Sequence, residues 1–143
     1  MGCPFCSDME IQERILFSTE YSFAFLTQTP IVPGHTLISP KRHIATLDEL
    51  SGAEWKDMWD MFSQVKQALA KTFQSEGFNF ALNEGTCAGQ TVPHIHFHIL
   101  PRKQGDTGII EYEPRKFLYR PGSREKTPQE ELVAIVKNIK AYL

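Results

Sequence analysis

Residues 94–100 read His-Ile-His-Phe-His-Ile-Leu, and this stretch decides how the chain folds. In a β-strand successive side chains point to opposite faces of the sheet, so His94, His96 and His98 would share one face and the apolar residues between them the other. The chain has five histidines, and three of them fall in this short stretch. We therefore predict a core strand whose apolar face is buried and whose imidazole face lines a cleft.

The composition of the whole chain is typical of a single globular domain. It has 143 residues, of which 41 % are apolar and 22 % charged, with a formal net charge of −2, and we expect one domain over residues 1–143. Lysine and arginine are scattered, which argues against binding to long nucleic acids or to a membrane surface. No membrane span or signal peptide is visible. Three cysteines, two of them in Cys3-x-x-Cys6, suit a reducing compartment, so we expect a cytoplasmic protein.

Short runs of β-branched and aromatic residues predict several strands around the histidine stretch. Turn residues such as Pro33-Gly34 separate these runs, and a loop of small residues over 84–90 leads into the histidine strand. The other expected strands cover residues 15–18, 21–26, 35–39 and 78–83.

Two capping boxes predict two helices. Ser51 followed by Glu54 begins a long helix with apolar residues at three- and four-residue spacing, which we expect to end near Gly77. Thr127 followed by Glu130, with a proline at the first helical position, begins a C-terminal helix. The pattern as a whole predicts an α+β fold with a mainly antiparallel sheet, one long central helix and a C-terminal helix.

Three imidazoles on one face suit two kinds of chemistry. A His-x-His pair on a strand can chelate zinc. Alternatively, a neutral imidazole, whose usual pKa is about 6.5, attacks phosphorus while its neighbours stabilise charge. On a strand that rises about 3.3 Å per residue, His94 and His98 lie about 13 Å apart, so one phosphoryl group cannot meet both equally. His96 in the middle is the natural attacking group, and an end histidine is free for another task.

Residues 94–100 also match the motif His-φ-His-φ-His-φ-φ, with φ apolar, and the chain therefore resembles the histidine triad (HIT) family over roughly residues 1–110. The resemblance implies a HIT-like fold. It also implies that His96 attacks the α-phosphorus of a nucleotide and forms a nucleotidyl-histidine, which water or another acceptor resolves. Further segments look like the fragile-histidine-triad branch of dinucleoside polyphosphate hydrolases: Ser-Phe-Ala-Phe-Leu at 22–26, Pro-Ile-Val-Pro-Gly-His at 30–35, Gly-Gln-Thr-Val at 89–92 and Leu-Pro-Arg-Lys at 100–103.

The same resemblance implies roles for residues around His96. His98 and His35 are similar to the phosphate-contacting histidines of the family and complete the expected catalytic group. Thr91 matches the position whose hydroxyl contacts the α-phosphate or the leaving group. Fixed donors and cationic imidazoles of this kind stabilise the charge that develops on the phosphoryl oxygens.

Other residues are expected to bind the remainder of the substrate. Asn83 matches the position of an amide near the phosphate bridge, and Gln90 belongs to the matching segment before the triad. At the position of Thr27 many relatives carry Asp or Asn, which hydrogen-bonds the ribose hydroxyls. A threonine there makes only one such hydrogen bond. Phe5 and Phe25 are candidates to line the base pocket, although an aromatic side chain beside a sheet is more often part of the core.

Cys3-x-x-Cys6 is a close thiol pair of the kind that binds zinc. Such pairs also serve redox chemistry, but no parallel βαβ pattern surrounds this one. A tetrahedral site needs two more ligands, and neither His43 nor His94 has a task in the nucleotide chemistry. The chain resembles bacterial HIT proteins in which these four positions bind zinc, which implies a structural zinc on Cys3, Cys6, His43 and His94.

The leading hypothesis is a nucleotide hydrolase or nucleotidyl transferase that acts on dinucleoside polyphosphates or nucleoside phosphoramidates. A nucleotide-binding regulatory module with slow turnover shares every binding residue and stays open. In a third hypothesis the triad is itself a catalytic zinc site, which leaves His35 and Thr91 without a purpose. We expect no organic cofactor, and magnesium (Mg²⁺) only as an ion that arrives with the substrate. Family members are usually homodimers, so the resemblance also implies a homodimer.

Overall fold

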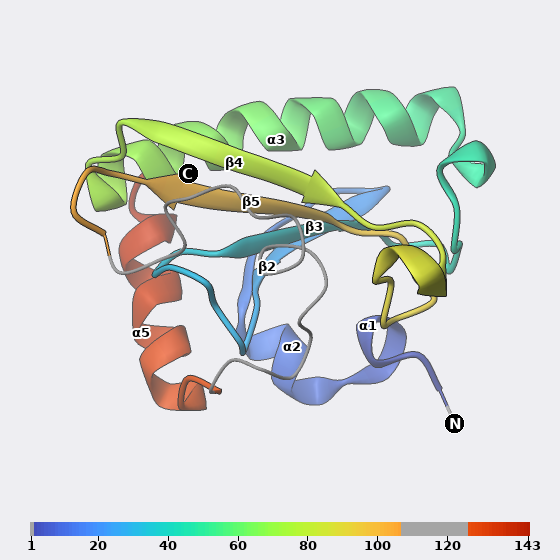
Figure 1. Cartoon of the computed structure of the whole chain (residues 1–143), viewed down its shortest axis with the longest axis horizontal. Coiled ribbons are helices and arrows are strands. Elements are labelled where there is room, and N and C mark those ends of the chain that lie inside the picture. Colours follow the sequence, from blue (N-terminus) through green and yellow to red (C-terminus); the bar gives the residue numbers. More distant parts are fainter. Residues whose placement is uncertain (1, 107–125) are drawn as a thin grey trace.

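The computed structural model describes residues 2–106 and 126–143, and it confirms an α+β fold built on one antiparallel sheet (Figure 1). The five strands stand in the order β1-β2-β3-β5-β4, and every neighbouring pair is antiparallel. Their boundaries lie within one residue of the expected ones, except that the histidine strand begins three residues late and ends two residues late. The strands are β1 (Ile15–Ser18), β2 (Ser22–Leu26), β3 (Thr36–Pro40), β4 (Gly77–Leu82) and β5 (Phe97–Arg102).

The long central helix is α3 (Gly52–Phe73), and it begins with the predicted capping box. The Ser51 hydroxyl accepts from the N–H of Glu54 at 3.1 Å, and the Glu54 carboxylate accepts from the N–H of Ser51 at 2.9 Å. The helix ends earlier than expected because Gln74 adopts a left-handed conformation with φ 52°, and Gly77 already begins β4. In Figure 1, α3 lies along one face of the sheet, where it packs against β2, β3 and β5.

The capping box predicted for the C-terminal helix, α5 (Gln129–Lys140), is wrong. Pro128 is the N-cap and has an extended ψ of 141°, so it lies outside the helix, and no side chain of the described residues caps the helix start. Thr127 instead donates its backbone N–H to the carbonyl oxygen of Gln28 at 2.8 Å. The loop after β2 therefore holds Thr127 away from the helix terminus.

Four short helical elements escape prediction from the sequence, because a single turn leaves little periodicity to detect. Two of them, α1 (Pro4–Ser7) and α2 (Met9–Glu13), lie across the sheet from α3 (Figure 1). The other two are 3₁₀ turns in connecting loops, η1 (Leu47–Glu49) and η2 (Thr86–Ala88). None of the helices in the described part of the chain combines the length and hydropathy that crossing a bilayer requires.

Alternation along β2 divides the interior into two cores. Ala24 and Leu26 belong to the larger core, which α3 and α5 cover. Phe23 and Phe25 point to the opposite face and pack with Ile11 of α2 in a smaller core. The smaller core includes Leu37, which stands opposite His98, so it supports the face of the sheet on which the imidazole of His98 lies.

The histidine stretch forms a strand only in its second half. β5 begins after His96, and in the preceding segment Ile95 donates its N–H to the carbonyl oxygen of Ile44 at 2.7 Å. The rings of His96 and His98 remain neighbours, with centroids 5.1 Å apart. His94 instead joins the N-terminal cysteines. The prediction of one continuous strand is therefore wrong at its N-terminal end, and this departure separates His94 from the other two imidazoles.

Candidate active site and metal centre

His96 is buried, and its backbone surroundings determine which ring nitrogen is free. Its Nδ1 lies 2.9 Å from the carbonyl oxygen of His94. Because a carbonyl only accepts, Nδ1 carries the proton, and the lone pair of the neutral ring is on Nε2. Burial lowers the pKa of His96 below its usual value, against the opposing effect of this hydrogen bond. The ring is therefore neutral at pH 7, and Nε2 has the lone pair that a nucleophile requires.

His35 and His98 form a hydrogen-bonded pair whose protons can be assigned from the backbone. The N–H of Ile31 donates to Nδ1 of His35 at 3.1 Å, so neutral His35 carries its proton on Nε2. That Nε2 lies 2.9 Å from Nδ1 of His98 and donates to it. Neutral His98 then carries its own proton on Nε2. The loop before β3 thus selects the tautomer of both rings.

A cavity of about 260 Å³ lies beside His96 and His98, on the side of the sheet that α1 and α2 cover. Phe5 of α1 meets the ring of His96 edge to face, with centroids 4.9 Å apart. His35 is fully buried behind His98 and is not part of the cavity lining. Other lining side chains are Asp8, Ile11, Arg14, Phe25, Thr27, Leu37 and Thr91.

Two of the predicted substrate-binding residues, Thr91 and Thr27, line this cavity. The Thr27 hydroxyl accepts from the N–H of Thr29 at 3.2 Å, which orients it within the loop after β2. Asn83 and Gln90 lie outside the lining. Their substrate contacts, like the other residue roles, stay predictions.

The amide of Gln90 organises the loop that precedes the triad. Its oxygen accepts from the N–H of Gly85 at 2.7 Å, and its nitrogen donates to the carbonyl oxygen of Ala45 at 3.1 Å. Asn83 donates from Nδ2 to the carbonyl oxygen of Gly89 at 3.3 Å in the same loop. These bonds fix the backbone that leads to Thr91.

The structure brings Cys3, Cys6, His43 and His94 together, with all four ligand atoms within 4.8 Å of one another. Nδ1 of His94 lies 3.5 Å from each of the two sulfur atoms, and Nδ1 of His43 lies 3.6 Å from the sulfur of Cys6. The two Nδ1 atoms are 3.3 Å apart. Zinc bonds of about 2.3 Å to sulfur and 2.05 Å to nitrogen place S and N about 3.55 Å apart, and two N atoms about 3.35 Å apart, in a regular tetrahedron. Four of the six distances among these ligand atoms therefore match a tetrahedral zinc site, and the other two lie within 4.8 Å.

The protonation of His94 also suits a metal ligand. Its Nε2 lies 2.7 Å from the carbonyl oxygen of Pro40 and must donate to it, which leaves the lone pair on Nδ1 facing the cysteines. Burial lowers the pKa of His94, so the ring is neutral. Burial, together with the neighbouring Cys3, raises the pKa of the Cys6 thiol. These four side chains are of the types that hold zinc, which would supply a positive charge to two adjacent thiolates.

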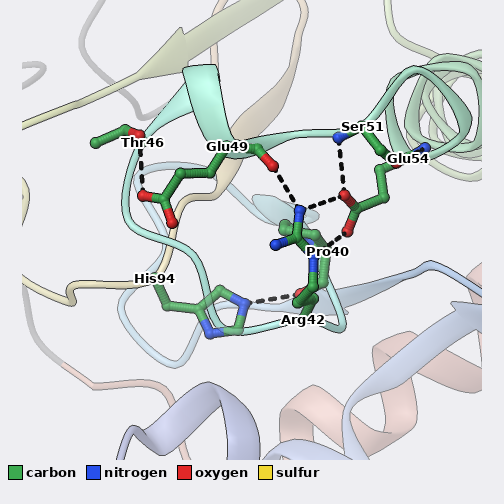
Figure 2. Close-up of polar contacts among 7 residues, drawn as sticks. All are labelled: Pro40, Arg42, Thr46, Glu49, Ser51, Glu54 and His94. Carbon is green, nitrogen blue, oxygen red and sulfur yellow. Dashed lines mark hydrogen bonds and ion pairs between the residues drawn. The ribbon is translucent and has the colours of Figure 1, made fainter.

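The loop that follows Pro40, the last residue of β3, is joined to the start of α3 by Arg42 (Figure 2). Arg42 donates from Nη2 and Nε to the two carboxylate oxygens of Glu54, at 2.7 and 3.2 Å, and also donates to the carbonyl oxygen of Glu49. Arg42, aided by the bonds from the first turn of α3, lowers the pKa of Glu54 to about 2 although burial opposes the shift. This ion pair therefore links the start of α3 to the chain two residues after Pro40, whose carbonyl oxygen accepts from His94.

Sequence reasoning misses Asp8, Arg14 and Arg42. Asp8 accepts from the N–H of Glu10 at 2.9 Å and caps α2. The one local signal for this role is that an aspartate, a common N-cap residue, directly precedes Met9–Glu13. Arg14 donates to the backbone carbonyl oxygen of Leu26, 12 residues away in the sequence, and Arg42 to that of Glu49, 7 residues away. Such partners leave no pattern in the sequence.

Comparison with known proteins identifies relatives along most of the chain. The HIT domain family model matches residues 8–105. Bis(5'-adenosyl)-triphosphatase of Dictyostelium discoideum is 36 % identical over 118 residues, which cover 82 % of this chain and 76 % of that protein. Bis(5'-nucleosyl)-tetraphosphatase (asymmetrical) of Schizosaccharomyces pombe is 37 % identical over 100 residues, 70 % of this chain. The match spans about half of that relative, 55 % of its length.

Solved structures share the fold over nearly the whole chain. A hypothetical histidine triad nucleotide-binding protein from Sulfolobus tokodaii superposes with a TM-score of 0.79 at 26 % identity, covering 98 % of this chain and 91 % of that one. A zinc-bound histidine triad family protein from Mycobacterium smegmatis gives a TM-score of 0.74 at 26 % identity, covering 99 % and 94 %. The fold, the sequence match and the three histidines of residues 94–98 all point to the same family, and the chain belongs to the HIT domain family.

Proposed function

We propose that this protein is a nucleotide hydrolase or nucleotidyl transferase that acts at the α-phosphate of dinucleoside polyphosphates or nucleoside phosphoramidates, through a nucleotidyl-His96 intermediate. The observation that carries the proposal is the protonation of His96. Its Nδ1–H is bound to the carbonyl oxygen of His94, so the Nε2 lone pair is available beside the cavity. The relatives named for hydrolysis of bis(5'-adenosyl) and bis(5'-nucleosyl) compounds support the same chemistry.

The reaction divides into two displacements at phosphorus. In the first, Nε2 of His96 forms an N–P bond while the bond from phosphorus to the leaving group breaks. In the second, water or another acceptor attacks phosphorus, the N–P bond breaks, and the acceptor loses its proton. His98, with its proton on Nε2, and the Thr91 hydroxyl are the donors for the phosphoryl oxygens and the leaving group.

His35 is a positioning residue in this proposal, because it meets His98 and does not line the cavity. Its Nε2–H holds His98 in the tautomer that donates toward phosphate. This role replaces the direct phosphate contact that the family resemblance implies. The proposed substrate contacts also include Thr27, which binds the ribose. Gln90 and Asn83 contribute by fixing the backbone of the loop that leads to Thr91.

Steady-state kinetics of a His96→Ala variant test the nucleophile. We expect kcat on a dinucleoside triphosphate or a nucleoside phosphoramidate to fall by at least about 10³-fold, as when other covalent nucleophiles are removed. Lys137→Ala, an exposed change on α5, is the matched control and keeps full activity. Full turnover by the His96 variant contradicts the proposal. A wild-type kcat far below about 1 per second favours the regulatory module instead.

We also propose a structural zinc ion on Cys3, Cys6, His43 and His94. The S–N and N–N distances support it, and the Mycobacterium smegmatis relative is described as zinc-bound. Bound there, zinc would be held by Cys3 and Cys6 at α1, by His43 in the loop after β3 and by His94 in the segment before β5, and it would join these three parts of the chain. It takes no part in the displacements, and no organic cofactor is needed. Magnesium enters the proposal only as an ion carried by the substrate.

A homodimer through α3 and β4 is the proposed assembly of this single domain in the cytoplasm. β4 is an edge strand, and Trp59 is 72 % exposed and Phe80 52 % exposed on the surface that α3 and β4 share. These side chains, with Trp55, line an apolar hollow of about 480 Å³. A second copy of the chain would bury this apolar surface. The three free cysteines agree with a reducing compartment.

A further inference from the structure

Arg14 has no task in the proposed displacements, yet its side chain is buried beside the cavity. Only 2 % of the residue is exposed. The guanidinium donates from Nη1 to the carbonyl oxygen of Leu26 at 2.7 Å and from Nε to that of Glu10 at 3.4 Å. No group among the described residues accepts from Nη2, and Arg14 lines the same cavity as His96. A buried cation is costly unless its donors are satisfied, so a ligand with acceptor atoms would complete its hydrogen bonding.

An acceptor lines the cavity together with this donor. One carboxylate oxygen of Asp8 accepts from the N–H of Glu10 at 2.9 Å, which fixes the side chain at the start of α2. The charge of Asp8 also acts on Arg14, where it opposes the lowering of the guanidinium pKa by burial. The cavity therefore carries a fixed cationic donor and a fixed anionic acceptor besides its histidines.

The register of the sheet separates this pair from the imidazoles. His98 on β5 stands opposite Leu37 on β3, and Leu37 stands opposite Phe25 on β2, the strand whose end binds Arg14. Neighbouring strands lie about 4.8 Å apart, so β5 and β2 are about 10 Å apart. The floor between them is apolar, and Phe5 packs edge to face on Phe25. A phosphate at His98 thus leaves room for a flat ring over the apolar floor, with its edge near Arg14.

We propose that Arg14 and Asp8 read the base of the bound nucleotide and select guanine over adenine. Guanine presents the acceptors O6 and N7, which suit a guanidinium, and the donors N1–H and N2–H, which suit a carboxylate. Adenine keeps the N7 acceptor but has an amino donor in place of O6 and a lone pair at N1, so it offers Arg14 one acceptor where guanine offers two and sets the N1 lone pair against Asp8. The inference rests on the proposed function and names its substrate class, although the relatives above are named for adenosyl and nucleosyl compounds.

Calorimetric titration of the wild-type protein with GMP and with AMP tests the inference without turnover. We expect GMP to bind roughly 10- to 100-fold more tightly than AMP, the usual range for one well-placed pair of base contacts. Equal affinity, or tighter binding of AMP, overturns the base assignment and leaves the nucleotide chemistry at His96 intact. Failure of both nucleotides to bind overturns the proposed function and the inference together.

Two variants locate the preference. Arg14→Met removes the donors and keeps an unbranched side chain, and Asp8→Asn replaces one carboxylate oxygen by an amino group while keeping an oxygen to cap α2. Each should bring the ratio of GMP to AMP affinity to within about threefold of unity, with little change in AMP affinity. Glu10→Gln is the matched control. The charge of Glu10 also acts on Arg14, but the Glu10 side chain lies outside the cavity lining. This variant should therefore keep the wild-type ratio of GMP to AMP affinity.

The variants also separate base reading from a structural role. If Arg14→Met does not fold, Asp8→Asn and the wild-type ratio still decide the question. A wild-type preference for GMP that survives in a folded Asp8→Asn or Arg14→Met protein assigns base reading to other residues and overturns the inference.

Discussion

Replacement of Glu54 by Gln tests the ion pair that fastens the loop before η1 to α3. A glutamine still offers an oxygen to the N–H of Ser51, so the capping box survives and the ion pair with Arg42 is lost. The Glu54 side chain is 5 % exposed and the Arg42 side chain 54 % exposed. The substitution therefore leaves the guanidinium partly solvated and removes a nearly buried carboxylate.

The expected magnitude follows from the pKa of Glu54. Folding lowers it from 4.5 to about 2, and a shift of this size corresponds to about 3 kcal/mol of stability. Water around Arg42 screens part of this energy, so we expect Glu54→Gln to destabilise the protein by about 2 kcal/mol at pH 7. Because the folded pKa is the lower one, the stabilisation is complete above about pH 4.5 and is lost as the pH falls toward 2. About 1 kcal/mol of the difference should remain at pH 3.5.

Urea unfolding of wild type and Glu54→Gln at pH 7 and pH 3.5, both with chelator to remove zinc, measures this difference. Asp60→Asn is the matched control: it breaks the exposed pair with Lys56 on the same helix, where both side chains are more than half exposed, and should change stability by less than about 0.5 kcal/mol. Equal destabilisation of Glu54→Gln at the two pH values, or none at pH 7, refutes the reasoning.

Three further predictions concern the metal, the assembly and the tautomers. Cys3→Ser protein purified without added metal should contain no zinc by elemental analysis and should melt roughly 5–10 °C below wild type. The control variant at an exposed cysteine, Cys87→Ser, should match wild type in both measurements, and zinc retained by Cys3→Ser contradicts the site. Trp59→Glu should convert a dimer to a monomer in light scattering, and an unchanged mass places the interface elsewhere. His35→Ala should lower kcat by about 10- to 100-fold with KM nearly constant and shift the pH profile of kcat, because His98 loses its fixed tautomer; a change in KM alone assigns His35 to binding.

The regular part of the fold can be predicted because its signals are local. The aromatic-rich run of β2, the alternation of residues 94–100 and the Ser51 capping box each lie within a few residues, and the structure contains β2, β5 and the capped helix. The Thr127 capping box fails because the backbone bond from Thr127 to Gln28 holds it outside the helix, and no local pattern contains that partner. Local signals therefore identify the elements, and long-range bonds decide where some of them begin.

The cluster of Cys3, Cys6, His43 and His94 was predictable as a set of ligand types, since the sequence supplies a thiol pair and two histidines without other tasks. Its geometry was not, because His94 reaches the cysteines only where the histidine stretch departs from the strand before β5. The buried guanidinium of Arg14 was not predictable either. Its burial depends on α2 and on a carbonyl at the end of β2, which are separate elements in the sequence.

Direct trapping of the covalent intermediate tests the central claim about His96. Enzyme mixed with excess dinucleoside triphosphate, stopped in alkali within one turnover and digested with protease, should yield a peptide that contains residues 94–100 and has the added mass of one nucleotidyl group on His96. A phosphoramidate is labile in acid, so the alkaline stop preserves the adduct. His96→Ala should give no adduct, and Lys137→Ala the wild-type amount. Product formation with no adduct, or an adduct on His98, contradicts the account.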